Sequence, residues 1–250
     1  MHKQQEPGFR WRGGEIARIE GLSDAVFAFA VTLLVVSLEV PKTFNELAQL
    51  MRGFVPFAIS FFLLMQVWHE QYRFFRRYNL QDSTTTLLNC ILLFVVLFYV
   101  YPLKFLWSYL VSMWMGNGKI PQIRLPDGTF ERMIEPHQLG QLMAIFSGGY
   151  LAVSCIFFLL FVHALRKSQQ LELNPREIHM TKVSIGAILI QAVTAAVSLL
   201  ILLVGRQHSG DLAGLIYPIL LGPGFTIYYS IMGAKQRRIP ESATPQKSLP

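Results

Sequence analysis

The sequence has few charged residues and few cysteines for its length. Only 15% of its 250 residues are Asp, Glu, Lys or Arg, whereas 52% are hydrophobic. A soluble domain of this size needs more charge to cover its surface, so the composition excludes an ordinary soluble protein. The two cysteines, Cys90 and Cys155, both lie in apolar segments. Two are too few for a disulfide scaffold or a metal site.

The sequence also lacks the motifs of a membrane enzyme. It has no HExxH motif, and we assign no Ser, His and Asp arrangement and no paired carboxylates to one helical face. We therefore expect no enzymatic activity and no cofactor. The net charge of +7 does not predict a nucleic-acid partner, because the basic residues cluster at the ends of apolar segments.

What the sequence does contain is a series of long apolar stretches. Stretches of about 20 residues recur, which is the length that crosses a bilayer as a helix. They predict an all-α membrane protein with six transmembrane helices, and a short polar turn joins the first two. The first stretch lacks a small-residue cleavage pattern, so we expect no signal peptide. The first expected helix begins near Glu15 to Glu20 and ends at Val40. The second covers Phe54 to Trp68 and the following HEQYRFFRR. The other four cover Thr85–Met113, Leu139–Leu165, Val183–Val204 and Leu212–Ala234.

Six spans put both termini on one side of the membrane. Fifteen of the 22 Lys and Arg residues lie on that side and six on the other, with Lys104 inside the third expected helix. The positive-inside rule therefore predicts that both termini are cytoplasmic. We expect a flexible N-terminus over residues 1–14, a six-helix transmembrane domain over 15–234 and a disordered basic tail over 235–250.

The first apolar stretch, Leu22 to Val40, carries one apolar stripe. At about 100° per residue, four of its side chains and then a carboxylate fall on one side of a helix. Such a stripe faces either a partner or a pathway. Its members are Phe29, Thr32, Leu33 and Val36, followed by Glu39 at the predicted outer mouth.

A polar layer is expected near the cytoplasmic ends of the first three helices. Asp24 is the only carboxylate inside a long apolar run, and an isolated Asp in a bilayer costs several kcal/mol, about 3 on insertion scales. We therefore expect it to be buried and paired, with Arg18, His69 and Asn89 as donors. Two interpretations stay open, a network that clamps the helices together and a proton or ion relay. The layer contains Arg18, Ser23, Asp24, Trp68, His69 and Asn89.

The segment Arg18-Ile-Glu-Gly-Leu22-Ser23-Asp24, followed by AVFAFAVTLLV, resembles the Arg-x-x-x-Phe-Ser-Asp signature of the transmembrane protein 175 family. This is a family of potassium channels of endosomes, lysosomes and prokaryotes. The resemblance extends through Trp68, His69 and Asn89. The chain departs from the family at Leu22, where the family has Phe, and at Phe29, where it usually has Ile or Leu.

The resemblance implies that the first helices of several subunits line a central pore and narrow it with apolar side chains. One signature in the chain implies a prokaryotic homotetramer in the plasma membrane, with the lipid bilayer and permeant monovalent cations as its partners. By distance from the motif Asp, the pore-lining positions are Phe29, Thr32, Leu33 and Val36. The resulting hypothesis is a potassium-permeable channel. The alternative is a proton-coupled transporter or proton-leak channel that uses Asp24 and His69.

Overall fold

The computed structural model describes residues 9–36, 41–116, 121–124, 128–135, 137–205 and 209–236. Over these residues the chain forms seven helices and one antiparallel hairpin. The prediction of a helical protein is confirmed. The six long helices are α1 (Arg18–Val36), α3 (Phe54–Tyr78), α4 (Ser83–Met115), α5 (Gln138–Arg166), α6 (Pro175–Val204) and α7 (Ser209–Gln236).

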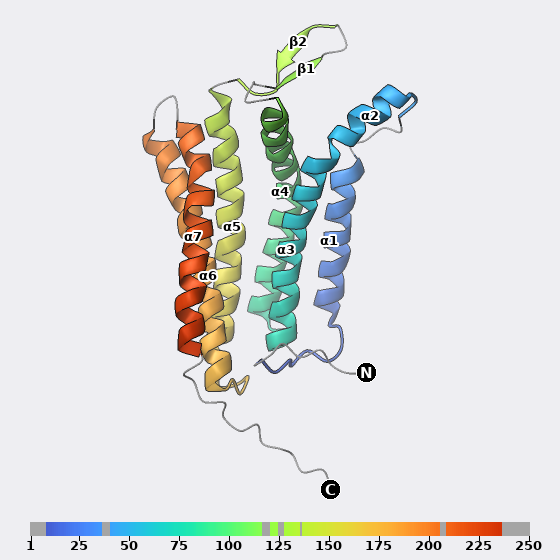
Figure 1. The fold of residues 1–250 in the computed structure, drawn as a ribbon. Coiled ribbons are helices and arrows are strands. Elements are labelled where there is room, and N and C mark those ends of the chain that lie inside the picture. Colours follow the sequence, from blue (N-terminus) through green and yellow to red (C-terminus); the bar gives the residue numbers. More distant parts are fainter. Residues whose placement is uncertain are drawn as a thin grey trace.

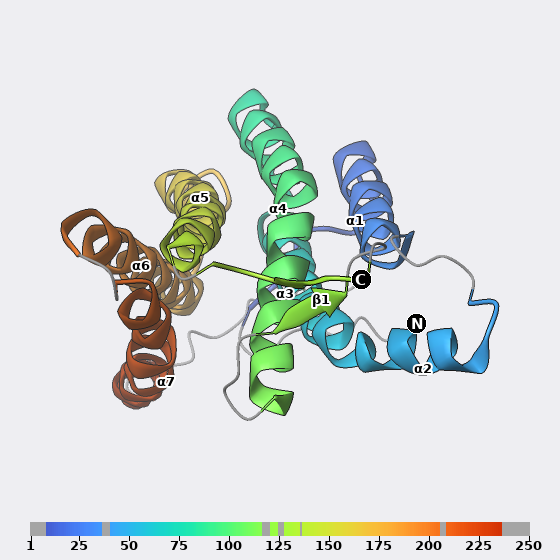
Figure 2. The same cartoon turned by 90° about the horizontal axis from the view of Figure 1, so that it is seen from above.

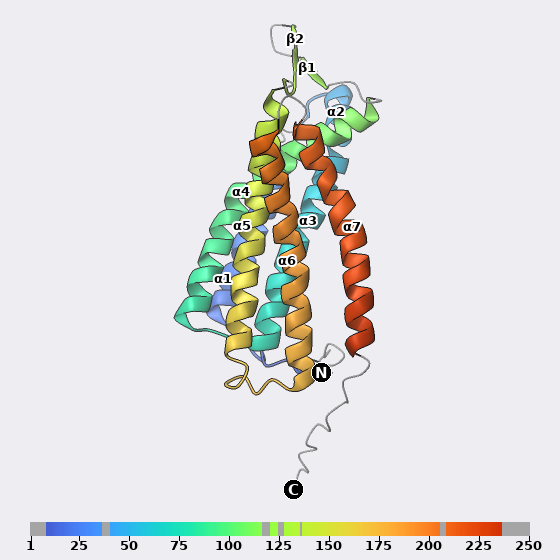
Figure 3. The same cartoon turned by 90° about the vertical axis from the view of Figure 1, so that its left-hand side faces the viewer.

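The long helices run side by side and alternate in direction (Figure 1). α1, α3 and α4 pack against one another, α5, α6 and α7 do the same, and contacts between α4 and α5 join the two groups. Figure 2 shows the two groups from above, and Figure 3 shows α7 at the edge of the bundle. We call the end where α1, α4 and α6 begin the lower end, and the opposite end the upper end.

Local sequence signals set several helix ends. The Asp82 side chain caps α4 by accepting a hydrogen bond from a backbone N–H three residues on. Asn174 and Glu177 form a capping box at the start of α6, and Pro175 occupies its first turn. α6 therefore begins about two turns before the apolar run that predicted it. α3 ends at Asn79, which takes the left-handed conformation with φ of 48°.

The lower ends of α4 and α5 are joined by a charged junction. The Asp82 carboxylate accepts hydrogen bonds from Lys167 and from the Thr85 backbone, and its Oδ2 lies 2.6 Å from Nε2 of His163. Burial alone would raise the pKa of Asp82. The hydrogen bonds from Lys167, Thr85 and His163 outweigh it and hold the pKa well below its usual range.

The N-terminal segment packs against the lower end of the bundle. Phe9 is only 2% exposed, and its ring meets that of Tyr78 edge to face at 5.6 Å. Arg12 pairs with the buried Glu177 carboxylate, with 2.8 Å between Nη2 and Oε2. In the described part of the segment predicted to be flexible, an apolar and a charged side chain therefore both have partners in the bundle.

The predicted six-helix domain, residues 15–234, contains the starts and nearly the whole length of the long helices. The predicted disordered tail begins at 235. Its first two residues still belong to α7, and the rest of the tail lies outside the described residues.

A short helix, α2 (Phe44–Arg52), occupies the place where the sequence predicted only a polar turn. It lies beyond the upper end of α1 and leads into α3 (Figure 1). Phe44, Leu47 and Met51 are exposed and recur at helical spacing, three and four residues apart. That spacing is the signal for α2 that the sequence reasoning missed.

A hairpin lies between α4 and α5, in the loop whose structure the sequence left undefined. β1 (Gln122–Arg124) pairs with β2 (Phe130–Arg132), and Gln122 lies opposite Arg132. Gly128, in the connection between them, has a φ of 87°, a conformation that side chains rarely adopt.

Among the described residues, four helices are long and apolar enough to cross a membrane: α4, α5, α6 and α7 up to Gly233. α1 and α3 are not in this set, although they run beside the lower and middle parts of α4 (Figure 1). The finding supports a multi-pass membrane protein.

Candidate functional site

One face of α1 is closely packed. Ser23, Phe27, Ala30 and Leu34 are between 0% and 2% exposed. They recur every three or four residues, which is the spacing of one helical face, and α1 packs on α3 and α4. This face fixes the rotation of α1 in the bundle.

The opposite face of α1 is open in the single chain. Phe29 is 56% exposed, Leu22 is 53% and Val35 is 43%. These side chains form a mostly apolar strip along the helix, which we call the open face. Its members are Leu22, Ala25, Phe29, Thr32 and Val35.

The predicted pore-lining residues divide between this face and its edge. Phe29 and Thr32 lie on the open face, and the Thr32 hydroxyl donates to a backbone carbonyl one turn below. Leu33 is half-buried and packs against the core. Val36 is the last residue of α1, and its side chain is not described. Glu39 lies outside the described residues.

Three buried polar side chains tie α1, α3 and α4 together. The Asn89 Nδ2 donates to Ser23 Oγ at 2.9 Å, and Gln71 Nε2 donates to Asn89 Oδ1 at 2.7 Å. None of the three is more than 2% exposed. We call this group the buried network. The sequence reasoning missed Gln71, although it follows Trp68 by three residues and therefore shares its side of α3.

Asp24 has a different donor from those expected. The Trp68 Nε1 donates to Asp24 Oδ1 at 2.8 Å, while Asn89 serves the buried network. Arg18 and His69 are exposed on the single chain, and so is Asp24 itself. In the single chain the predicted layer thus forms two contacts, Asp24 with Trp68 and Ser23 with Asn89, and Arg18 and His69 as donors to Asp24 stay a prediction. α1 is rotated so that Asp24 meets the indole ring at the edge of the bundle.

A small cavity of about 190 Å³ lies between α1 and the lower half of α3. Glu20 and Asp24 both line it, because one helical turn separates them. The expectation that no two carboxylates share a helical face is therefore wrong. We call this space the α1–α3 cavity.

Lys104 holds the upper end of α1. Its Nζ donates to the backbone carbonyl of Leu34 at 2.6 Å. The last carbonyls of a helix have no partner within the helix, and a cation there also meets the negative end of the helix dipole. The sequence reasoning left Lys104 without a role, although it is a lone cation in an apolar run.

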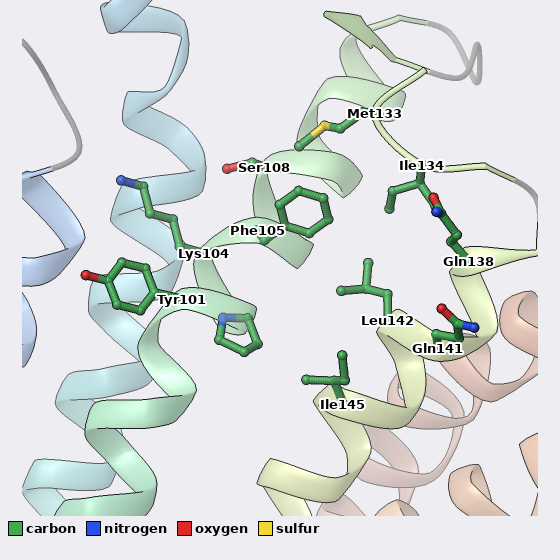
Figure 4. Close-up of a pocket in the computed structure, with 11 residues that line it drawn as sticks. Tyr101, Lys104, Phe105, Ser108, Met133, Ile134, Gln138, Gln141, Leu142 and Ile145 are labelled. Carbon is green, nitrogen blue, oxygen red and sulfur yellow. The ribbon is translucent and has the colours of Figure 1, made fainter. Parts of the chain in front are cut away.

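A larger cavity of about 620 Å³ lies between α4 and α5 at the upper end (Figure 4). Its walls are mostly apolar, and the polar tips of Tyr101 and Lys104 point away from α5 in this view. No residue of α1 lines it. It is therefore separate from the open face.

The bundle and its site define a class of protein. In this helical membrane protein, one face of α1 packs tightly on the buried network. The other face of α1 is open and mostly apolar, so it is presented to a partner or a pathway. The chain belongs to the family of the endosomal/lysosomal potassium channel TMEM175, whose family model matches residues 18–99. This match covers α1, α3 and the first half of α4, which together hold the buried network.

Similar proteins match over most of the chain. A potassium channel of Marivirga tractuosa is 40% identical over 238 residues, which are 93% of this chain and 94% of that protein. A potassium channel of Chamaesiphon minutus is 28% identical over 158 residues, covering 60% of this chain and 66% of that protein.

Two solved structures are similar as well. The first is a variant of the potassium channel MtTMEM175 in complex with a nanobody–MBP fusion protein. It has a TM-score of 0.76 and 38% identity and covers 93% of this chain and 97% of that one. The second is a lysosomal potassium-selective channel TMEM175 homolog from Chamaesiphon minutus, with a TM-score of 0.51 and 20% identity. It covers 88% of this chain and 96% of that one and supports the fold alone.

Proposed function

We propose that the protein is a potassium-permeable cation channel in which four chains place α1 around a central pore. The open face carries this proposal, because Phe29 and Thr32 are exposed there while the residues of the closely packed face are at most 2% exposed. Four copies of this face would form the wall of a pore. The relatives named as potassium channels support the choice of cation.

The proposed channel has six spans in each subunit, with both termini in the cytoplasm. The support is the alternating course of the six long helices, with α1 and α3 beside α4 (Figure 1), and the excess of Lys and Arg at the lower end. The bacterial relatives support a place in the prokaryotic plasma membrane, where the bilayer and four copies of this chain are the partners.

The proposed constriction lies at Phe29. Four phenyl rings at one level leave little room for water, and a dry constriction is a barrier to any ion. Thr32, Leu33 and Val36 would line the pore above it. Four copies of Glu39 would ring the outer mouth and concentrate cations there.

A planar-bilayer recording of the purified protein tests this function. Under a gradient of potassium against sodium, we expect discrete single-channel steps whose reversal potential moves toward that of potassium. Currents without steps, which follow a proton gradient instead, would favour the alternative of a proton-coupled transporter or proton leak through Asp24 and His69.

A further inference from the structure

The α1–α3 cavity lies on the side of α1 that faces away from the proposed pore. Nine residues at about 100° each put Glu20 roughly half a turn around the helix from Phe29. The remaining wall comes from the lower half of α3. The cavity is lined by Ile16, Glu20, Asp24, Trp68, Gln71, Tyr72, Phe75 and Arg76.

Glu20 brings an unpartnered carboxylate oxygen into this cavity. The residue is 8% exposed, and its Oε1 is buried with no hydrogen-bond partner among the described residues. Its other oxygen, Oε2, lies 3.8 Å from Nη2 of Arg76, which is too long for a hydrogen bond. A buried carboxylate oxygen without a donor is costly, so a ligand that supplies positive charge would stabilise it.

The charges around the cavity do not balance. Glu20 and Asp24 contribute two carboxylates, and Arg76 contributes one guanidinium. Side chains one helical turn apart lie about 5–6 Å from each other at Cβ, so the two carboxylates repel each other. The lining therefore carries one more negative charge than positive charge.

Two further groups can offer oxygen atoms. Trp68 donates to Oδ1 of Asp24, so the other carboxylate oxygen remains as an acceptor. Gln71 gives its amide N–H to Asn89, so its carbonyl oxygen is the atom that remains for another partner. The cavity thus combines carboxylate and carbonyl oxygens with a surplus of negative charge.

We propose that the α1–α3 cavity binds a monovalent alkali cation, K⁺ or Na⁺, through oxygen atoms of Glu20, Asp24 and Gln71. Hard cations take oxygen ligands of this kind. The volume of about 190 Å³ holds a cation with several waters, since one water needs about 15 Å³. A monovalent ion matches the single surplus charge of the lining.

The bound cation would balance the surplus negative charge of the cavity and tie the lower half of α1 to α3. It would therefore fix the position of α1 from behind, at a place that the permeating ions do not pass. This site is independent of the proposed pore, and the two can be tested in the same crystals.

Anomalous scattering from Rb⁺ tests the proposal directly. The full chain is crystallised in RbCl as the wild type, as Glu20→Gln and as Glu70→Gln, a control that removes a carboxylate from α3 outside the cavity lining. We expect a peak between Glu20 and Asp24 in the wild type and in Glu70→Gln, and its loss in Glu20→Gln. A wild-type map without this peak, or a peak that survives Glu20→Gln, would overturn the proposal.

The same maps keep the two proposals apart. A peak in the cavity with none along the axis of the α1 helices supports the cation site and counts against the channel. Peaks on the axis with an empty cavity support the channel and count against the cation site. If Glu20→Gln does not fold, the wild-type map still decides. Thermal unfolding then gives a second measurement, since the wild-type midpoint should rise when KCl replaces choline chloride at equal ionic strength, and the rise should be lost in Glu20→Gln.

Discussion

At the scale of single residues, each side chain of the buried network forms a hydrogen bond with another member. Asn89 is its centre, since its amide donates to Ser23 and accepts from Gln71. A buried polar network stabilises a fold only when its members are all paired, and a partly paired one costs more than an apolar core. The polar part of the contact between α1, α3 and α4 therefore depends on the Asn89 side chain.

Asn89→Ala tests this dependence. The substitution removes the acceptor of the buried Gln71 amide and the donor to Ser23, whose hydroxyl still donates to the Ile19 carbonyl. We therefore expect the free energy of unfolding to fall by about 1–3 kcal/mol. Denaturation of the purified protein in detergent measures it. Gln81→Ala is the control, because that amide is exposed and bonds the Asn79 side chain at 3.3 Å, and we expect a change within about 0.5 kcal/mol. Equal losses in both variants would show that the network does not stabilise the bundle.

At the scale of helices and loops, the lower end of the bundle holds two charged contacts between elements. The Asp82 junction joins α4 to α5, and the Arg12–Glu177 pair joins the N-terminal segment to α6. Both depend on carboxylates that lie within the first turn of a helix or just before it, where the helix dipole also favours negative charge.

Asp82→Asn should make the protein less stable near neutral pH. Asn still caps α4, so the substitution removes chiefly the charge that pairs with Lys167 and His163. Because the folded pKa of Asp82 is depressed, its stabilisation is present above the unfolded pKa of about 3.9 and is lost as the pH falls toward the folded value. We expect the difference in thermal midpoint between wild type and variant to shrink below about pH 4.

The control for this experiment is Glu135→Gln, whose exposed pair with Arg132 spans 3.7 Å. An exposed pair contributes about 0–1 kcal/mol, so we expect a small effect at every pH. A difference between Asp82→Asn and the wild type that stays constant down to pH 2 would contradict the account of Asp82.

Glu177→Gln tests the attachment of the N-terminal segment. It removes the charge that compensates Arg12, whose side chain is only 12% exposed, and breaking a buried pair costs about 3–5 kcal/mol. We expect lower stability and faster proteolysis between residues 9 and 17. Glu172→Gln is the matched control, because its pair with Arg10 is exposed and 3.8 Å long. Similar proteolysis rates for the two variants would mean that the pair does not hold the segment.

These elements also show how far the sequence alone could predict the fold. The long helices follow from runs of apolar residues, which are local signals. The N-terminal segment could not be predicted, because Arg12 and Glu177 are 165 residues apart and no pattern near either one indicates the other. α2 had a local signal, but the three exposed apolar side chains of this nine-residue segment indicate a helix only when their spacing is counted.

At the scale of the whole molecule, the open face is the feature that a single chain does not explain. Periodicity predicted Phe29 and Thr32 on that face, and both are exposed there. It could not predict that Leu33 turns partly toward the core or that Asp24 meets Trp68, because the rotation of α1 depends on its packing against α3 and α4. In the proposed homotetramer, the open face of each chain meets the other three chains. Native mass spectrometry in detergent measures the number of subunits, and we expect four.

Phe29→Ala then distinguishes a pore wall from ordinary packing. At a constriction, the loss of four phenyl rings widens and wets the narrowest level, so we expect a higher resting flux of cations into liposomes and weaker selectivity, with the tetramer intact. At a packing site between helices, the same change leaves a cavity that costs about 3–5 kcal/mol, and assembly should fail before any flux rises. Flux and size-exclusion profiles are measured together on the same preparations.

Phe94→Ala provides the control, since Phe94 is 70% exposed on α4 and lies outside α1. It removes the same ring from another exposed helical surface, so we expect neither the flux nor the elution volume to change. A rise in flux that is confined to Phe29→Ala assigns the ring to the pore. Intact tetramers with unchanged flux in both variants would remove Phe29 from the constriction. Thr32, the polar residue of the open face, would then be the position at which to look for the narrowest level.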